Sequence, residues 1–166
     1  MGHGSAAGPA RAGTPARRAQ PAAVMRRQYG EIATPDDPPL LALEFRRSDL
    51  GPVRRVVAAA AAQAGLFGAR LQSFVLAVNE ITTNAVLHGG GLGRLRLWWT
   101  GQQLVCEVSD SGPGMPDGHV PAEIPPPPEA TGGRGLWLTR TLCDRFSLHS
   151  NGHGTTVRLA TSVERV

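Results

Sequence analysis

The sequence predicts a two-layer α/β sandwich, in which three helices cover one face of a mixed, mostly antiparallel sheet. Three observations support this fold class. The expected elements run β-α-α-β-β-loop-α-β-β along the chain. Two pairs of strands are close enough in sequence to form hairpins, which pair antiparallel. Strands and helices do not alternate regularly, so a doubly wound parallel sheet is not expected.

The composition fits one folded domain and excludes several classes of site. The chain has 166 residues, of which 41% are hydrophobic, enough for a single core. No apolar run approaches the about 18–20 residues that span a bilayer, and no secretion signal follows Met1, so we expect a cytoplasmic protein without a membrane partner. All 17 basic residues are arginine. This excludes sites that depend on a P-loop or Schiff-base lysine.

Charge and cysteine content narrow the function further. The net charge of +4 is scattered in arginine pairs, without a basic helix interleaved with aromatic residues. Direct binding of nucleic acid is therefore not expected. Cys106 and Cys143 both lie in apolar segments, which is typical of buried free thiols in a reducing compartment.

The first half of the chain is expected to contain a tail, one strand and two helices. Residues 1–38 are rich in Ala, Gly, Pro and Arg and are predicted to be a disordered tail, so the folded domain spans 39–163. Residues 40–48 form the first strand. A helix follows over 49–66 with Asp49 as its N-cap, and a longer helix covers 69–89 and ends in glycine.

The second half is expected to contain two hairpins, separated by a loop and a helix. Residues 93–101 and 102–110 alternate with a period of two, and their turn falls at Thr100–Gln103. If the face with Leu97 packs under the helices, Trp98 is exposed and marks a possible partner surface. The Pro/Gly-rich loop over 111–133 is long enough to be functional or mobile. A third helix covers 134–146, and a second hairpin turns at Asn151–Gly152.

The long helix carries polar groups in an apolar setting. Glu80 and Asn84 are one turn apart, on the side that also holds Ser73 and His88. They either form a solvated face or belong to a site. Because Leu76, Ala77 and Leu87 share that side, the helix is apolar nearly all round and is expected to be buried. Buried polar groups need partners, so we favour the site.

Two glycine-rich stretches flank the long loop. Asp110 ends a strand with its side chain toward the core, and Gly112 and Gly114 follow where a Cβ would block a ligand. The alternative is a turn that Asp110 caps. Before the third helix stand Gly132, Gly133 and Gly135, and free N–H groups at a helix start attract anions. The alternative there is a hinge.

Taken in order, "NEITTNAVLHG", "DSGPG", "GGRGL" and "GTT" closely resemble the ATP-binding domain of the GHKL superfamily, which includes gyrases, heat-shock chaperones and histidine kinases. The resemblance covers about residues 40–160 and implies the Bergerat-type ATP-binding fold. The form "E-x-x-x-N-A-x-x-H" is most similar to the stand-alone anti-sigma-factor serine/threonine kinases.

The resemblance implies roles for individual residues. Glu80 would be the general base, and Asn84 would ligate Mg²⁺ at the phosphates of ATP. Asp110 would accept a hydrogen bond from the adenine amino group. The remaining nucleotide-binding residues would be Gly112, Gly114, Met115, Gly133, Arg134, Gly135, Leu136, Thr155 and Thr156. The loop over 111–133 would be the ATP lid. His88 is expected to have a structural role at the helix end.

The resemblance also implies a function and partners. The protein would sequester a sigma factor, phosphorylate a serine of an anti-sigma antagonist, and form a homodimer. The alternative is an ATP-binding regulatory module without kinase activity. A DNA-binding role driven by the arginines is a third hypothesis, which predicts binding that weakens steeply with salt.

Overall fold

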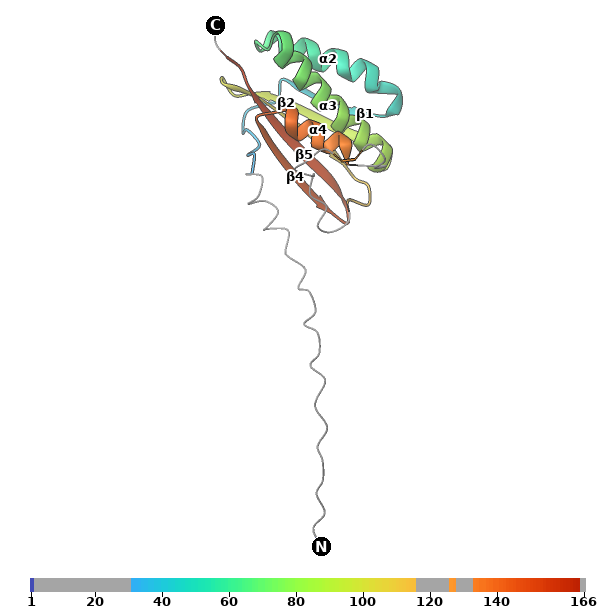
Figure 1. Ribbon diagram of the computed structural model, residues 1–166. Coiled ribbons are helices and arrows are strands. Elements are labelled where there is room, and N and C mark those ends of the chain that lie inside the picture. The colour runs from blue at the N-terminus through green and yellow to red at the C-terminus, as the bar shows by residue number, and fades with distance from the viewer. Residues whose placement is uncertain (2–30, 116–125, 128–132, 165–166) are drawn as a thin grey trace.

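A computed structural model describes Met1, residues 31–115, 126–127 and 133–164. Three helices lie over one face of a five-stranded sheet (Figure 1), which confirms the predicted fold class. The sheet order is β1-β2-β3-β5-β4, and each neighbouring pair is antiparallel. The strands are β1 (Leu41–Phe45), β2 (Gly93–Trp99), β3 (Gln103–Asp110), β4 (Arg145–Asn151) and β5 (Gly154–Ser162).

The helices form the second layer. A 3-10 turn, η1 (Arg47–Asp49), leads into α2 (Leu50–Gln63), which is followed by α3 (Gly68–His88) and α4 (Arg134–Leu142). Helix α3 lies between the other two, and its residues Phe74, Val78 and Ile81 are at most 2% exposed. Since burial of one such side chain contributes about 1.5–3 kcal/mol, this central helix anchors the helical layer. No helix in the described ranges is both long and apolar enough to cross a membrane.

Two local expectations differ from the structure. Asp49 precedes α2, but its side chain accepts a hydrogen bond from the Arg46 N–H (2.8 Å) and caps the 3-10 turn instead of the helix. Helix α4 ends at Leu142 and not at 146, because the following residues join the sheet. The Asp144 N–H donates to the carbonyl of Ala160 (3.0 Å), so pairing with β5 overrides local helix propensity.

Both predicted hairpins form. The Thr100 N–H donates to the carbonyl of Gln103 (3.0 Å) between β2 and β3. Between β4 and β5, the His153 N–H donates to the side chain of Asn151 (2.8 Å). The tight β4–β5 turn keeps Ser150 directly opposite Thr155 in the ladder, a pairing that matters below.

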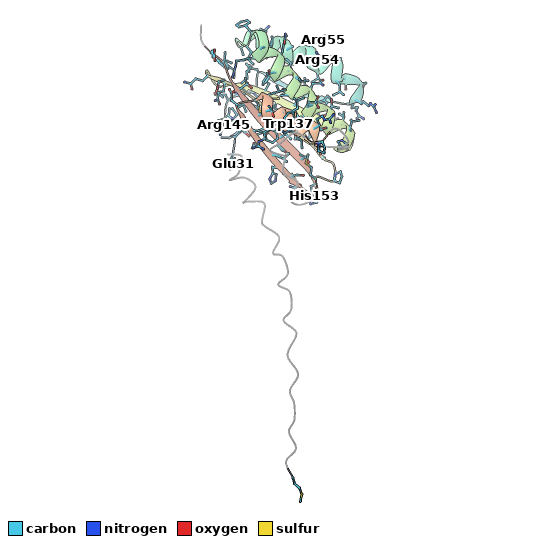
Figure 2. All side chains as sticks on the ribbon, in the orientation of Figure 1. Glu31, Arg54, Arg55, Trp137, Arg145 and His153 are labelled. Atoms are coloured by element: carbon cyan, nitrogen blue, oxygen red, sulfur yellow. The ribbon has the colours of Figure 1, made fainter. Side chains whose placement is uncertain are left out.

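The sheet face without helices is covered by the segment before β1. Ile32 is 2% exposed and packs with Trp98, Val105 and Ala160, and the Trp98 Nε1–H donates to the carbonyl of Asp37 (3.0 Å). Trp98 is therefore 2% exposed, and the expectation that it marks an open partner surface was wrong. The described residues from 31 onward already pack on the sheet, where Glu31 lies beside Arg145 of β4 (Figure 2), although their composition placed the domain start at 39. Residues 2–30 of the predicted tail lie outside the described ranges.

A buried carboxylate organises this helix-free face. Glu107 is 3% exposed and pairs with Arg96 and, at 2.7 Å, with Arg158. Arg158 also donates to the carbonyl of Ile32 (3.3 Å), and the guanidinium of Arg96 lies 5.2 Å from the centre of the Trp98 ring. Both arginines that neutralise Glu107 therefore also contact the segment or the tryptophan that it covers.

An ion pair between Arg70 and Asp144 stabilises the end of the sheet where β4 begins and β5 ends. The Arg70 Nη2–H donates to the carboxylate of Asp144 (2.7 Å) and to the carbonyl of Ser162 (2.9 Å), and the Ser162 N–H donates to the same carboxylate. Partial burial acts to raise the pKa of Asp144, but the hydrogen bonds from Ser162 and Arg70 outweigh it and leave the pKa below its ordinary value.

The cysteines are unpaired, as expected. Burial, with a smaller contribution from Asp144, raises the pKa of Cys143 to about 12. Burial also raises the pKa of Cys106, which is fully buried in the core. Both side chains therefore act as apolar packing groups, since only a thiolate is a strong nucleophile.

Candidate functional site

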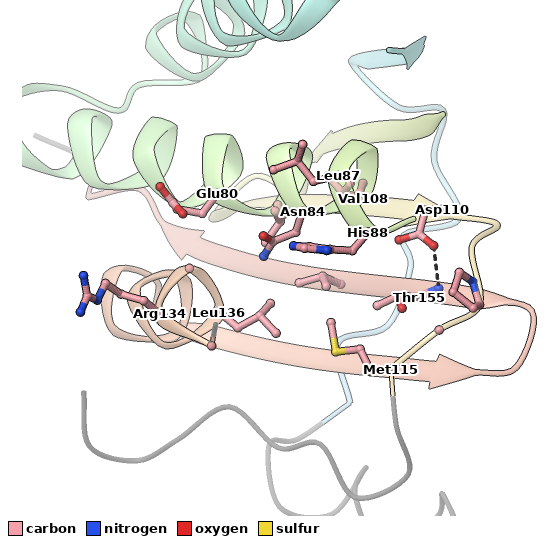
Figure 3. Close-up of a pocket in the computed structure, with 17 residues that line it drawn as sticks. Glu80, Asn84, Leu87, His88, Val108, Asp110, Met115, Arg134, Leu136 and Thr155 are labelled. Carbon is pink, nitrogen blue, oxygen red and sulfur yellow. Dashed lines mark hydrogen bonds between the residues drawn. The ribbon is translucent and has the colours of Figure 1, made fainter. Parts of the chain in front are cut away.

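A cavity of about 730 Å³ opens between α3, the end of β3, the start of α4 and the start of β5 (Figure 3). This volume lies within the range of small-molecule and cofactor sites. Ten of the residues selected from the sequence line it: Glu80, Asn84, Asp110, Gly114, Met115, Gly133, Arg134, Gly135, Leu136 and Thr155. The tertiary structure thus brings together residues from four separate stretches of sequence.

Glu80 and Asn84 form the α3 side of the cavity. They are one helical turn apart and only half-buried, because this side of α3 faces α4 across the opening. The start of α4 approaches closely: a Cβ on Gly135 would lie 2.8 Å from Glu80 Oε2 and 3.4 Å from Asn84 Nδ2. Glycine at 135 therefore keeps the carboxylate and the carboxamide clear of the α4 backbone.

Asp110 forms the opposite end of the cavity. Its Oδ1 accepts hydrogen bonds from the N–H groups of Gly112 (3.0 Å) and Thr155 (3.3 Å). Two backbone donors fix the carboxylate at the cavity wall and offset the cost of removing it from water. The sequence left two interpretations of Asp110 open, a turn cap and a residue of a site. The structure shows both, because Asp110 caps its own turn and also lines the cavity.

Glycines make this end possible by allowing backbones to touch. A Cβ on Gly89 would collide with the Asp110 side chain, and one on Gly154 would collide with the Asp110 carbonyl. A Cβ on Gly112 would lie 2.6 Å from Gly89 Cα. Gly112 is buried against the end of α3 and does not line the cavity. Its contribution is to let the β3 end and the α3 end pack together.

The start of α4 has the geometry of an anion site. Gly133, the residue before the helix, has φ of +83°, a left-handed conformation that glycine adopts without strain. The first N–H groups of a helix have no partner within it and carry partial positive charge, so they favour anions. The side chain of Arg134 lies on the same side of the cavity (Figure 3).

The rest of the lining is largely apolar and was not selected from the sequence. Ile81 and Ala85 come from the inner side of α3, and Val108 and Val157 come from facing positions of β3 and β5. Val108 has the strand parity of Asp110, and Val157 has that of Thr155, so period-two alternation was the available signal. Thr156 has the opposite parity and pairs with Ser109 away from the cavity.

His88, which the sequence placed at the helix end, also reaches the cavity (Figure 3). Leu87 and Pro113 complete the edge of the opening. Among the described residues, no group of three or more His, Cys, Asp and Glu side chains forms a metal site.

Comparisons with known proteins agree with this geometry. The profile of the family described as "Histidine kinase-like ATPase domain" matches residues 43–161 of this chain. Two proteins named "Anti-sigma F factor", from Thermoanaerobacter sp. (strain X514) and Thermoanaerobacter pseudethanolicus, are each 31% identical over 114 residues. Each alignment covers 64% of this chain and 80% of the relative.

A solved structure shares the fold. The crystal structure of the RsbU and RsbW domains of a Mycobacterium tuberculosis protein superimposes with a TM-score of 0.52 at 19% identity. The match covers 77% of this chain and 34% of that one, so this chain spans about a third of the crystallised chain. The profile covers more than half of the chain and includes both ends of the cavity. The chain therefore belongs to the histidine kinase-like ATPase domain family, whose domains bind ATP.

Proposed function

We propose that the protein is an ATP·Mg²⁺-dependent anti-sigma-factor serine/threonine protein kinase. In this proposal it sequesters a sigma factor and phosphorylates a serine of an anti-sigma antagonist. The observation that carries the proposal is the placement of Glu80 and Asn84 on one side of the cavity, next to the start of α4 and across from Asp110. A carboxylate beside a phosphate site is suited to remove a proton from an attacking hydroxyl.

In this proposal, one end of the cavity holds the adenine ring of ATP and the other end holds its phosphates. At the first end, the fixed carboxylate of Asp110 can accept a hydrogen bond from an exocyclic amino group. The apolar side chains of Ile81, Val108 and Val157 provide surfaces for a planar ring. At the second end, the N–H groups at the start of α4 and the guanidinium of Arg134 offer positive charge to phosphates.

The chemistry between these ends belongs to two side chains. The carboxamide oxygen of Asn84 is a suitable hard ligand for Mg²⁺, which would neutralise charge on the phosphates when bound. Glu80 orients the acceptor hydroxyl and accepts its proton. One turn of helix rises 5.4 Å, so a ligand at Asn84 and a base at Glu80 can serve adjacent atoms of the same reaction.

The proposed partners come from the relatives. Proteins named "Anti-sigma F factor" share 31% identity with this chain, which supports a sigma factor and its antagonist as partners. A homodimer is part of the same proposal. The rival function is an ATP-binding regulatory module without phosphotransfer, whose partners would respond to its nucleotide state.

The test combines binding and transfer. Calorimetry with ATP and Mg²⁺ should register binding by the wild type and by Glu80→Gln. Radiolabelled ATP and antagonist proteins from the same genome should give phosphoserine only with the wild type, because loss of a general base reduces transfer by about 10²–10⁴-fold. Glu44→Gln is the matched control, since Glu44 lies on the helix-free face and pairs with Arg94.

The outcomes separate the hypotheses. Binding of ATP without phosphoserine on any antagonist would favour the regulatory module. Equal transfer by Glu80→Gln and the wild type would remove Glu80 from the mechanism. Failure of the wild type to bind ATP would overturn the whole proposal.

A further inference from the structure

Ser150 joins three segments at the Asp110 end of the cavity. It lies near the end of β4, opposite Thr155 of β5, on the sheet face that carries the helices. Its Oγ accepts a hydrogen bond from the Met115 N–H (2.7 Å). The same oxygen lies 3.0 Å from Thr155 Oγ1 and 3.3 Å from the carbonyl of Gly154. None of the sequence patterns selected this serine.

These contacts use the full hydrogen-bonding capacity of the hydroxyl. A serine hydroxyl has one proton to donate and two lone pairs to accept with. Every group is satisfied when Ser150 accepts from the Met115 N–H and the Thr155 hydroxyl and donates to the Gly154 carbonyl. Since these protein contacts saturate the oxygen, its role is to hold other groups in place.

The groups it holds are themselves part of the cavity. Met115 and Thr155 both line it, on the side across from α3 (Figure 3). The contacts of Gly114 show that the segment leading to Met115 lies against the β4–β5 turn. Gly114 has φ of +75°, and a Cβ there would collide with the carbonyl of Asn151. The backbone that leads to Met115 therefore rests directly on the β4–β5 turn.

Thr155 links Ser150 to the carboxylate of Asp110. Asp110 accepts from the Thr155 N–H (3.3 Å), and Ser150 bonds the Thr155 side chain. Thr155 thus connects the end of β3 to Ser150, and Ser150 connects it to Met115. Removing the Ser150 oxygen breaks this chain at the step that reaches Met115, because no other described side chain is hydrogen-bonded to its N–H.

We propose that Ser150 is a positioning residue for nucleotide binding, which fixes Met115 and Thr155 as one wall of the adenine end. This inference rests on the proposed function, in which that end holds the base of an adenine nucleotide. Preorganised walls lower the ordering cost of binding. Ser150 acts on the cavity through Met115 and Thr155 and does not take part in phosphotransfer.

The first measurement uses the free full-length chain and needs no nucleotide. Hydrogen exchange of the Met115 amide, resolved by NMR, should become at least about fivefold faster in Ser150→Ala, because its acceptor is lost. Ser150→Cys, which keeps a side chain of similar shape but has a weak acceptor, should show the same direction. Ser150→Thr restores a hydroxyl on a strand that tolerates β-branched residues and should retain slow exchange.

The second measurement is calorimetry with ADP and Mg²⁺. Ser150→Ala and Ser150→Cys should bind about three- to tenfold more weakly, the range for one lost hydrogen bond, and Ser150→Thr should bind as the wild type does. In a transfer assay in which the ATP concentration is varied up to saturation, Ser150→Ala should raise the KM for ATP and leave kcat within about twofold. Ser147→Ala is the matched control, because Ser147 lies on the same strand but on the helix-free face.

The two measurements distinguish the inference from the function on which it rests. Unchanged Met115 exchange in both Ser150→Ala and Ser150→Cys would overturn the inference, whether or not the protein binds nucleotide. So would faster exchange with unchanged ADP affinity, or an equal effect of Ser147→Ala. If the wild type binds no ADP, the proposed function fails, and the positioning role for a nucleotide fails with it. The inference is supported if Ser150→Ala and Ser150→Cys show faster Met115 exchange and weaker ADP binding, while Ser150→Thr keeps both at the wild-type level.

Discussion

The segment before β1 gives the sharpest test of the packing. Ile32 is 2% exposed and is buried with Trp98, Val105 and Ala160 on the helix-free face of the sheet. Replacing it by alanine removes most of the side chain that covers the tryptophan. The composition of the surrounding sequence predicts a small effect, because it resembles a disordered tail. The structure predicts a large one.

The expected loss of unfolding free energy follows from the burial of Ile32 and from the backbone hydrogen bonds that remain in Ile32→Ala. Isoleucine-to-alanine changes in cores cost about 2–5 kcal/mol. Among the described residues this cluster has four buried members, fewer than the main core under the helices, so neighbours can adjust more easily and we expect about 2–3 kcal/mol. Backbone anchors remain, because Arg145 and Arg158 donate to the carbonyls of Glu31 (3.0 Å) and Ile32 (3.3 Å). The variant should therefore keep its fold.

Urea unfolding of the full-length chain, followed by tryptophan fluorescence, measures this free energy. The slope of the unfolding free energy with urea should stay unchanged while the midpoint falls. Leu40→Ala is the control, since Leu40 is 56% exposed and its loss should cost less than about 0.5 kcal/mol. An Ile32→Ala variant as stable as Leu40→Ala would refute the packing of this segment on the sheet.

Three further predictions concern charge and titration. Glu107→Ala should destabilise the fold by about 2–3 kcal/mol in urea unfolding, since its carboxylate is 3% exposed between two arginines. The depressed pKa of Asp144 contributes stability at neutral pH that is lost as the pH falls below about 4, so the difference between the wild type and Asp144→Asn should vanish in acid. With a pKa of about 12 for Cys143 and a raised pKa for Cys106, neither thiol should react with an alkylating reagent at pH 8 until the protein unfolds.

Each of these has a result that contradicts it. Glu44→Ala provides the exposed comparison for Glu107→Ala, because Glu44 and Arg94 are 59% and 64% exposed, and equal effects would mean that burial of Glu107 is unimportant. A stability difference for Asp144→Asn that persists into acid would point to packing instead of charge. Rapid labelling of the native protein would show that the thiols are accessible.

Sequence patterns were sufficient for the elements and for much of the cavity. Glu80 and Asn84 could be placed together because helix periodicity is a property of neighbouring residues. Asp110 could be given an inward direction from strand alternation. Their meeting in one cavity came from the family resemblance, since spacing along the chain does not show which helix faces which strand end. Ser150 was missed because its partners, Met115 and Thr155, are 35 and 5 residues away.

The sequence by itself indicated which side of its strand Trp98 occupies, but not what covers that side. Period-two alternation assigned Trp98 correctly to the face opposite the helices, and only the tertiary structure placed Ile32 over it. Similarly, glycine at 112 suggested a ligand, while the fold used it to bring two backbones together. The physical reason is the same in both cases. Direction is fixed by local backbone geometry, whereas burial depends on segments that arrive from elsewhere in the chain.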